Sequence, residues 1–122
     1  MVDIDGLITT DRAGLDPRHA PFAKSMPTSK DLLSIVKEVK PGALIGASTA
    51  RGAFTEEIIA EMARLNSRPI IFALSNPTSK AECTAEEAYR VTNGSVLFAS
   101  GSPFKNVEWK NRVYKPGQGN NA

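Results

Sequence analysis

The 122-residue sequence has little of several features that define common protein classes. Its single cysteine, Cys83, excludes an internal disulfide and a cysteine zinc cluster, and favours a reducing intracellular compartment, the cytoplasm or the mitochondrial matrix. No apolar run approaches the roughly 20 residues of a membrane helix. The N-terminus is acidic and lacks the basic residues of a targeting peptide. We therefore expect no membrane partner.

The charge of the chain is also small. The formal net charge is +2, and Lys and Arg are scattered without a dense basic run or an interleaved aromatic platform. We therefore expect no nucleic-acid partner. Hydrophobic residues make up 41% of the sequence, which is enough for a core, and the length suits one domain or part of one.

The sequence also lacks a Gly-rich dinucleotide fingerprint. A dinucleotide fold opens with a strand, the pattern G-x-G-x-x-G, a helix, and a second strand that ends in an acidic residue. Here the first residues read as that second strand, with Asp3 at its end. The last residues, 116–122, show no pattern of a closing helix. We therefore expect residues 1–122 to be a partial domain, cut at both ends from a longer protein.

The most informative segment that is present is residues 68–78. The five apolar residues 70–74 fit a strand that is buried on both faces. The motif Ser-Asn-Pro-Thr ends this strand, because Pro77 has no N–H for a ladder. Asn76 is then placed just past the carboxyl end of a parallel strand, where open α/β sheets bind ligands. Its amide can both donate to and accept from a small molecule.

The elements expected along the chain alternate between strands and helices. Helical spacing of apolar residues and polar caps predict helices near residues 32–39, 55–65 and 84–91, the first behind a possible capping box of Thr28 and Asp31. Short strands are expected at residues 1–5, 43–47, 70–74 and 95–99, and an irregular tail after them.

This alternation predicts an α/β fold: an incomplete Rossmann-like parallel sheet with flanking helices on both faces, lacking the first strand and the Gly-rich loop. Small polar residues follow the strands that end near Ala47, Leu74 and Ala99. Because the carboxyl ends of parallel strands meet at one edge of a sheet, we expect these residues to line one crevice.

Three blocks of the sequence resemble malic enzymes. The blocks are IFALSNPTSKAEC at residues 71–83, LFASGSPF at residues 97–104 and PGQGNN at residues 116–121. They occur in the right order, and the resemblance covers nearly the whole chain. It implies the later part of the nucleotide-binding domain of an enzyme that oxidises and decarboxylates malate to pyruvate and carbon dioxide. The implied cofactors are NAD or NADP with a divalent metal, Mg²⁺ or Mn²⁺, and the implied parent is a homodimer or homotetramer.

The resemblance also implies site residues. Asp3 matches the acid that meets the adenosine ribose, and Asn76 matches an asparagine beside the nicotinamide ribose and the substrate. Residues that lie along the cofactor are matched by Gly46, Ala47 and Ser48. The pair that closes the site is matched by Asn120, near the nicotinamide, and Asn121, near malate.

His19 lies near the position where this family selects its cofactor. It is either a partly charged partner of a 2′-phosphate or an exposed loop histidine. An acid such as Asp3 by itself favours NAD, because a carboxylate repels a 2′-phosphate. NADP-dependent members of the family offset that acid with a nearby cation, so the sequence leaves NAD and NADP open.

The chemistry-bearing residues of the family lie upstream of the matched segment. They are a tyrosine, a lysine, the Glu-Asp…Asp metal ligands and the phosphate loop. Tyr89 and Tyr114 do not lie in the tyrosine motif. We therefore expect no catalytic residue and no metal ligand in this chain, and no turnover from it alone. Two alternatives stay open: a nucleotide-binding or assembly module without chemistry, and another parallel-sheet hydroxy-acid dehydrogenase, since such enzymes also place Asn-Pro after a central strand.

Overall fold

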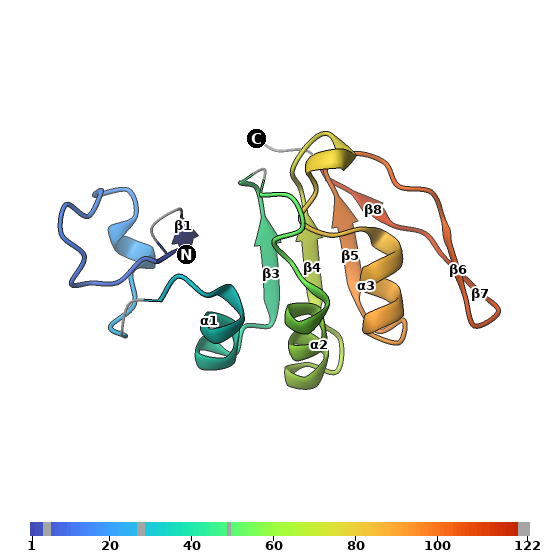
Figure 1. Cartoon of the computed structure of the whole chain (residues 1–122), viewed down its shortest axis with the longest axis horizontal. Helices are drawn as coiled ribbons and strands as arrows, with labels where there is room; N and C mark the ends of the chain where they lie inside the picture. Colours follow the sequence, from blue (N-terminus) through green and yellow to red (C-terminus); the bar gives the residue numbers. More distant parts are fainter. Residues whose placement is uncertain (4–5, 27–28, 49, 120–122) are drawn as a thin grey trace. The chain divides into compact units, whose positions relative to one another are not determined.

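The computed structural model describes residues 1–3, 6–26, 29–48 and 50–119. These residues form two compact units, Met1–Val39 and Lys40–Ala122, which are described separately (Figure 1).

The first unit contains little regular structure. Strand β1 (Val2–Asp3) pairs antiparallel with β2 (Gly6–Leu7), and a short 3₁₀ helix, η1 (Ala20–Phe22), interrupts the long loop that follows. An isolated parallel bridge joins Thr9 to Lys24 and ties the two ends of that loop together.

Helix α1 (Leu32–Val39) follows this loop. The carboxylate of Asp31 accepts a hydrogen bond from the backbone N–H of Ser34 at 3.2 Å, so Asp31 satisfies one of the free donors of the first turn. Thr28, the other half of the predicted capping box, lies outside the described residues. The helix buries Ile35 and Val36, as its spacing of apolar residues predicts.

The second unit is built on a four-stranded parallel sheet. Its strand order is β3 (Ala43–Gly46), β4 (Ile70–Ala73), β5 (Leu97–Ser100) and β8 (Gly117–Gln118). The helices α2 (Glu56–Leu65) and α3 (Ala85–Val91) connect the first three strands, and a 3₁₀ helix, η2 (Thr78–Lys80), lies between β4 and α3. The prediction of an incomplete Rossmann-like parallel sheet with flanking helices is confirmed.

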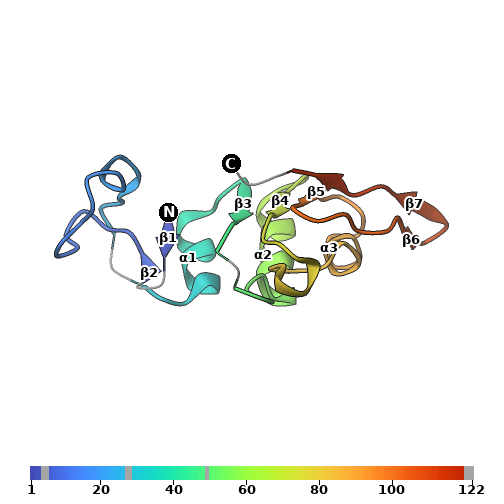
Figure 2. The same ribbon diagram turned by 90° about the horizontal axis from the view of Figure 1, so that it is seen from above.

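Both helices of this unit cover the same face of the sheet, so within this unit the prediction of helices on both faces is wrong. The order β3, β4, β5 advances in one direction, so two right-handed crossovers place α2 and α3 on one side, where they contact each other (Figures 1 and 2). The predicted caps are present: Thr55 accepts from the N–H of Ile58, and Thr84 accepts from the N–H of Glu87 at 3.2 Å.

The two faces of the sheet differ in burial. Ile71 and Ala73 of β4 are fully buried, whereas Ile45 is 61% exposed and Leu97 is 41% exposed. Phe72, which pairs with Ile45 in the register, is half-buried. The expectation that residues 70–74 form a strand buried on both faces is therefore wrong for one face, because both helices of the unit pack on the other.

The expectation of an irregular tail is also wrong. Strands β6 (Val107–Trp109) and β7 (Arg112–Tyr114) form an antiparallel hairpin, and β8 joins the sheet beside β5. The two turn residues, Lys110 and Asn111, have φ of 49° and 63°, the left-handed conformation that two-residue hairpin turns require. This turn lacks the glycine that usually marks it in a sequence.

Candidate functional site

Three strand ends meet at one edge of the parallel sheet. Gly46, Ala73 and Ser100 pair in one row of the register. The ladder continues one step further, because the N–H of Leu74 donates to the Gly46 carbonyl at 2.8 Å and the N–H of Gly101 donates to the Ala73 carbonyl at 3.2 Å. The segments after the three strands therefore begin side by side, as the sequence predicts.

Asn76 is exposed at this edge, and its side chain is held from the neighbouring strand end. The hydroxyl of Ser102 donates to Asn76 Oδ1 at 2.6 Å, and the hydroxyl of Ser100 donates to the Ser102 carbonyl at 2.6 Å. Between them, Gly101 allows close approach: a Cβ at this position would lie 2.1 Å from the Leu74 carbonyl oxygen. Ser102 received no separate role in the sequence analysis, although a Ser-Gly-Ser motif directly after a strand was its signal.

A buried carboxylate lies beneath the same edge. Glu82 is 1% exposed, and its Oε2 accepts a hydrogen bond from the Ser75 hydroxyl at 2.7 Å. The backbone N–H of Ser75 donates to Oε1 at a longer 3.4 Å. The carboxylate also lies against the end of β3, since a Cβ on Gly46 would be 2.4 Å from Oε2. Sequence reasoning missed Glu82, whose only signal is that it stands between the small residues Ala81 and Cys83.

The remaining residues predicted to follow the cofactor have different placements. Gly46 ends β3 and is buried, whereas Ala47 and Ser48 are exposed directly after it. The N–H of Gly119 donates to the Ser100 carbonyl at 2.8 Å, which holds the chain at this edge immediately before residue 120. Asn120 and Asn121 lie outside the described residues.

Asp3 lies in the first unit and is paired with a guanidinium. Arg12 Nη1 lies 2.7 Å from Asp3 Oδ2, and Arg12 Nη2 donates to the carbonyls of Gly6 and Leu7 at 3.1 Å each. Both side chains are partly exposed, at 32% for Asp3 and 18% for Arg12. Arg12 carries no sequence signal for this role, because it lies nine positions from Asp3 and the two side chains meet only through the fold.

His19 sits elsewhere in the loop of the first unit. It is the N-cap residue of η1, and its backbone N–H donates to the Asp16 carbonyl at 2.8 Å. Among the contacts of the described residues, none joins His19 to Asp3. The cation beside the predicted ribose-binding acid is therefore Arg12.

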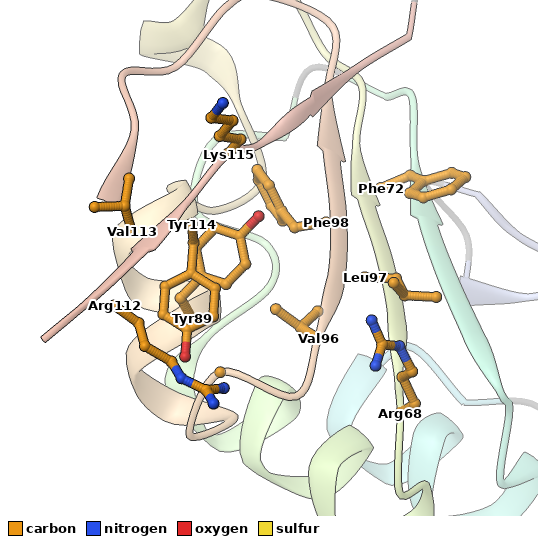
Figure 3. Close-up of a pocket in the computed structure, with 11 residues that line it drawn as sticks. Arg68, Phe72, Tyr89, Val96, Leu97, Phe98, Arg112, Val113, Tyr114 and Lys115 are labelled. Atoms are coloured by element: carbon orange, nitrogen blue, oxygen red, sulfur yellow. The ribbon is translucent and has the colours of Figure 1, made fainter. Parts of the chain in front are cut away.

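The two tyrosines that lie outside the family's tyrosine motif pack against each other. The rings of Tyr89 and Tyr114 stack with centroids 4.7 Å apart, and burial raises the pKa of Tyr89. Both line a 530 Å³ cavity between β5 and β7, together with aromatic, apolar and cationic side chains (Figure 3). None of the predicted site residues that the structure describes lines this cavity.

Cys83 is buried just before the cap of α3. Burial raises the pKa of its thiol to about 12, and the carboxylates of Glu87 and Glu82 add to the rise. The thiol is therefore protonated and unreactive at neutral pH.

Neither a metal-binding cluster nor a membrane-spanning helix occurs among the described residues. No group of three or more His, Cys, Asp or Glu side chains comes together there as a metal site. None of the helices in the described part of the chain has the length and apolar character that crossing a membrane requires.

Comparison with known proteins assigns the chain to a family. The chain matches, over residues 1–122, the family model described as "Malic enzyme, NAD binding domain". It therefore belongs to the family of malic enzyme NAD-binding domains, as the resemblance implies.

Several curated malic enzymes align with the whole chain. The "NAD-dependent malic enzyme, mitochondrial" of Ascaris suum is 64% identical over 122 residues, which are 19% of its length. The "NADP-dependent malic enzyme, mitochondrial" of Mus musculus is 54% identical over 123 residues, 20% of its length. The "NADP-dependent malic enzyme" of Homo sapiens is 53% identical over 123 residues, 22% of its length. The chain thus spans about a fifth of the length of these relatives.

Proposed function

We propose that this chain supplies the later part of the dinucleotide-binding domain of a malic enzyme and that it contributes residues that hold NAD or NADP and malate. In the proposed reaction of the whole enzyme, bound NAD or NADP takes a hydride from malate, which also loses carbon dioxide to give pyruvate. The observation that carries this proposal is the meeting of three strand ends at one sheet edge, with the Asn76 amide held there by Ser102. Such an edge is where parallel α/β sheets bind ligands.

The proposed roles are binding and orientation. Asn76 Oδ1 is held by the Ser102 hydroxyl, and among the described contacts its Nδ2 has no partner, so this N–H₂ is available to donate to a ribose or substrate oxygen. The exposed backbone after Gly46 follows the cofactor, and Asp3 accepts from the hydroxyls of the adenosine ribose. Asn120 and Asn121 are proposed to close the site from the chain end that follows Gly119.

The donor chemistry of the described residues fits a dinucleotide but not a metal. Amide, hydroxyl and carboxylate groups at Asn76, Ser102 and Asp3 suit ribose and amide partners. A divalent cation needs several oxygen or nitrogen ligands together, and the described residues offer no such cluster. The role proposed for this chain therefore contains no metal-dependent step.

The predicted ribose-binding acid and its partner favour different dinucleotides. Asp3 alone favours NAD, but its partner Arg12 brings a positive charge to the same place, and a guanidinium suits a 2′-phosphate. The names of two relatives quoted above include the word mitochondrial. We propose the mitochondrial matrix or the cytoplasm as the compartment, and a homodimer or homotetramer as the assembly of the whole enzyme.

A hybrid enzyme tests the proposal. In this hybrid, the 122 residues replace the segment of the Ascaris suum NAD-dependent malic enzyme with which they are 64% identical. We expect the purified hybrid to bind NAD or NADP in a calorimetric titration and to reduce it in the presence of malate and Mn²⁺. A folded hybrid that binds neither dinucleotide would overturn the proposal. A hybrid that binds dinucleotide but not malate would favour the alternative of a nucleotide-binding module.

A further inference from the structure

Glu82 has a buried carboxylate to which the proposed function assigns no role. It is 1% exposed, and burying an ionised carboxylate is costly unless donors surround it. Two of those donors belong to one residue, the hydroxyl and the backbone N–H of Ser75. Among the described contacts, the hydrogen bonds of this buried carboxylate are therefore made with the residue directly before Asn76.

The backbone of Glu82 is also held by a hydrogen bond. Its backbone carbonyl accepts a hydrogen bond from the N–H of Phe54 at 3.0 Å, and the preceding carbonyl, of Ala81, accepts one from the N–H of Gly52 at 3.1 Å. Glu82 thus joins the loop after β3 to the turn after β4. Because Gly46 has no Cβ, the carboxylate can lie directly against the end of β3.

These contacts leave little freedom to the turn at residues 75–76. Glu82 holds Ser75 from below, and Ser102 holds the Asn76 side chain from the adjacent strand end. Hydrogen bonds made by a supporting group of this kind fix the orientation of the group that meets the ligand.

We propose that Glu82 is a positioning residue: by anchoring Ser75, it sets the direction in which the Asn76 amide meets the dinucleotide and the substrate. The inference rests on the proposed function of Asn76. Glu82 itself touches no ligand in this proposal.

The test uses the hybrid enzyme with Glu82→Gln, which keeps the size of the side chain and removes its charge. We expect the KM for malate and the Kd for dinucleotide to rise, by less than the about tenfold expected for removal of the Asn76 amide, because the amide stays but is no longer held in place. A purely structural role would instead lower the amount of folded enzyme, and so kcat per total protein, while KM and Kd stay unchanged. Glu108→Gln is the control, because Glu108 is an exposed glutamate on β6 and undergoes the same change of charge.

Combined substitutions test whether Glu82 acts through Asn76. If Glu82 acts through Asn76, adding Glu82→Gln to Asn76→Ala produces no further rise in KM or Kd. Independent, multiplying effects of the two changes would overturn the proposal. Should Glu82→Gln prevent folding, Ser75→Ala removes the hydrogen bond between the Ser75 hydroxyl and Glu82 Oε2, and the same two criteria apply to it.

The inference and the proposed function fail in different ways. An unsubstituted hybrid that binds no dinucleotide removes the proposed function. A crystal structure of the Glu82→Gln hybrid then still tests the anchoring: a displaced turn at residues 75–76 supports it, and an unmoved turn overturns it. A hybrid with normal binding whose KM and Kd are unaffected by Glu82→Gln removes the positioning role alone.

Discussion

The hydroxyl of Ser102 donates a hydrogen bond to Asn76 Oδ1 across two neighbouring strand ends, at 2.6 Å. Because this bond occupies the oxygen of the amide, it distinguishes the two ends of a side chain that is otherwise nearly symmetric. It leaves the N–H₂ group of Asn76 as the end available to a ligand.

Removing the Asn76 amide is expected to weaken ligand binding. Asn76→Ala in the hybrid enzyme deletes a hydrogen bond to the bound ligand, for which about 1.4 kcal/mol, or about tenfold in Kd, is a typical cost. Ser102→Ala is expected to cause a smaller loss, because the amide stays but is no longer oriented. Calorimetric titration of both variants with dinucleotide checks the order, and a larger effect of Ser102→Ala contradicts it.

Replacing Arg12 is expected to alter cofactor preference. In Arg12→Gln, the carboxylate of Asp3 loses the guanidinium at 2.7 Å, so the charge near Asp3 becomes more negative and repels a 2′-phosphate more strongly. The affinity for NADP relative to NAD should therefore fall by about tenfold, the size of one charge-assisted interaction.

His19→Ala provides the comparison for this prediction, since no described contact joins His19 to Asp3. Titrations of the two hybrids with both dinucleotides separate the two residues. If His19→Ala shifts the NADP to NAD ratio and Arg12→Gln does not, selectivity resides with His19, as the sequence analysis allows.

Gly101 is expected to tolerate no side chain. In Gly101→Ala the new Cβ meets a backbone oxygen, that of Leu74, at 2.1 Å, so the adjacent strand ends must separate. We expect a loss of at least about 2 kcal/mol in the free energy of unfolding. Gly42→Ala is the control, because the nearest atom there is Asn66 Oδ1 at 3.7 Å, and its effect should stay within about 0.5 kcal/mol. Urea unfolding of the two variants measures the difference, and equal losses would contradict this explanation.

Because its thiol is buried, Cys83 is expected to lower the free energy of unfolding at alkaline pH. Its folded pKa of about 12 lies above the ordinary value of 9.0, so its contribution to stability is complete below pH 9.0 and is lost as the pH rises toward 12. Urea unfolding of the wild type and of Cys83→Ala at about pH 7 and about pH 10.5 checks this. The stability advantage of the wild type should shrink at the higher pH, and a constant advantage would show that the thiol does not titrate in this way.

The 122-residue chain by itself is expected to show no turnover of malate. The described residues contain no metal-binding cluster, and Tyr89 is stacked on Tyr114 rather than placed at the strand ends. Purified chain with malate, Mg²⁺ or Mn²⁺, and NAD or NADP should give no rise in the absorbance of reduced dinucleotide. A malate-dependent rise would refute this expectation.

Periodicity and turn chemistry predicted most of the second unit. Apolar runs at residues 43–47, 70–74 and 95–99 gave three parallel strands, and Thr55 and Thr84 marked the helix starts correctly. These features depend on residues close together in the chain, where local sterics and hydrogen bonds act. Strand β8 and the hairpin β6–β7 escaped prediction, because β8 consists only of Gly117 and Gln118, which show no apolar pattern, and the hairpin turn contains no glycine.

What the sequence by itself determined is the family of the chain, its parallel α/β class and the place of Asn76 at the end of a strand. Only the tertiary structure decided which side chains support that place. The contacts of Ser75 with Glu82, Asp3 with Arg12, and Asn76 with Ser102 join residues that are 7, 9 and 26 positions apart. Such pairs depend on how turns and strand ends pack, which no local pattern of residues encodes.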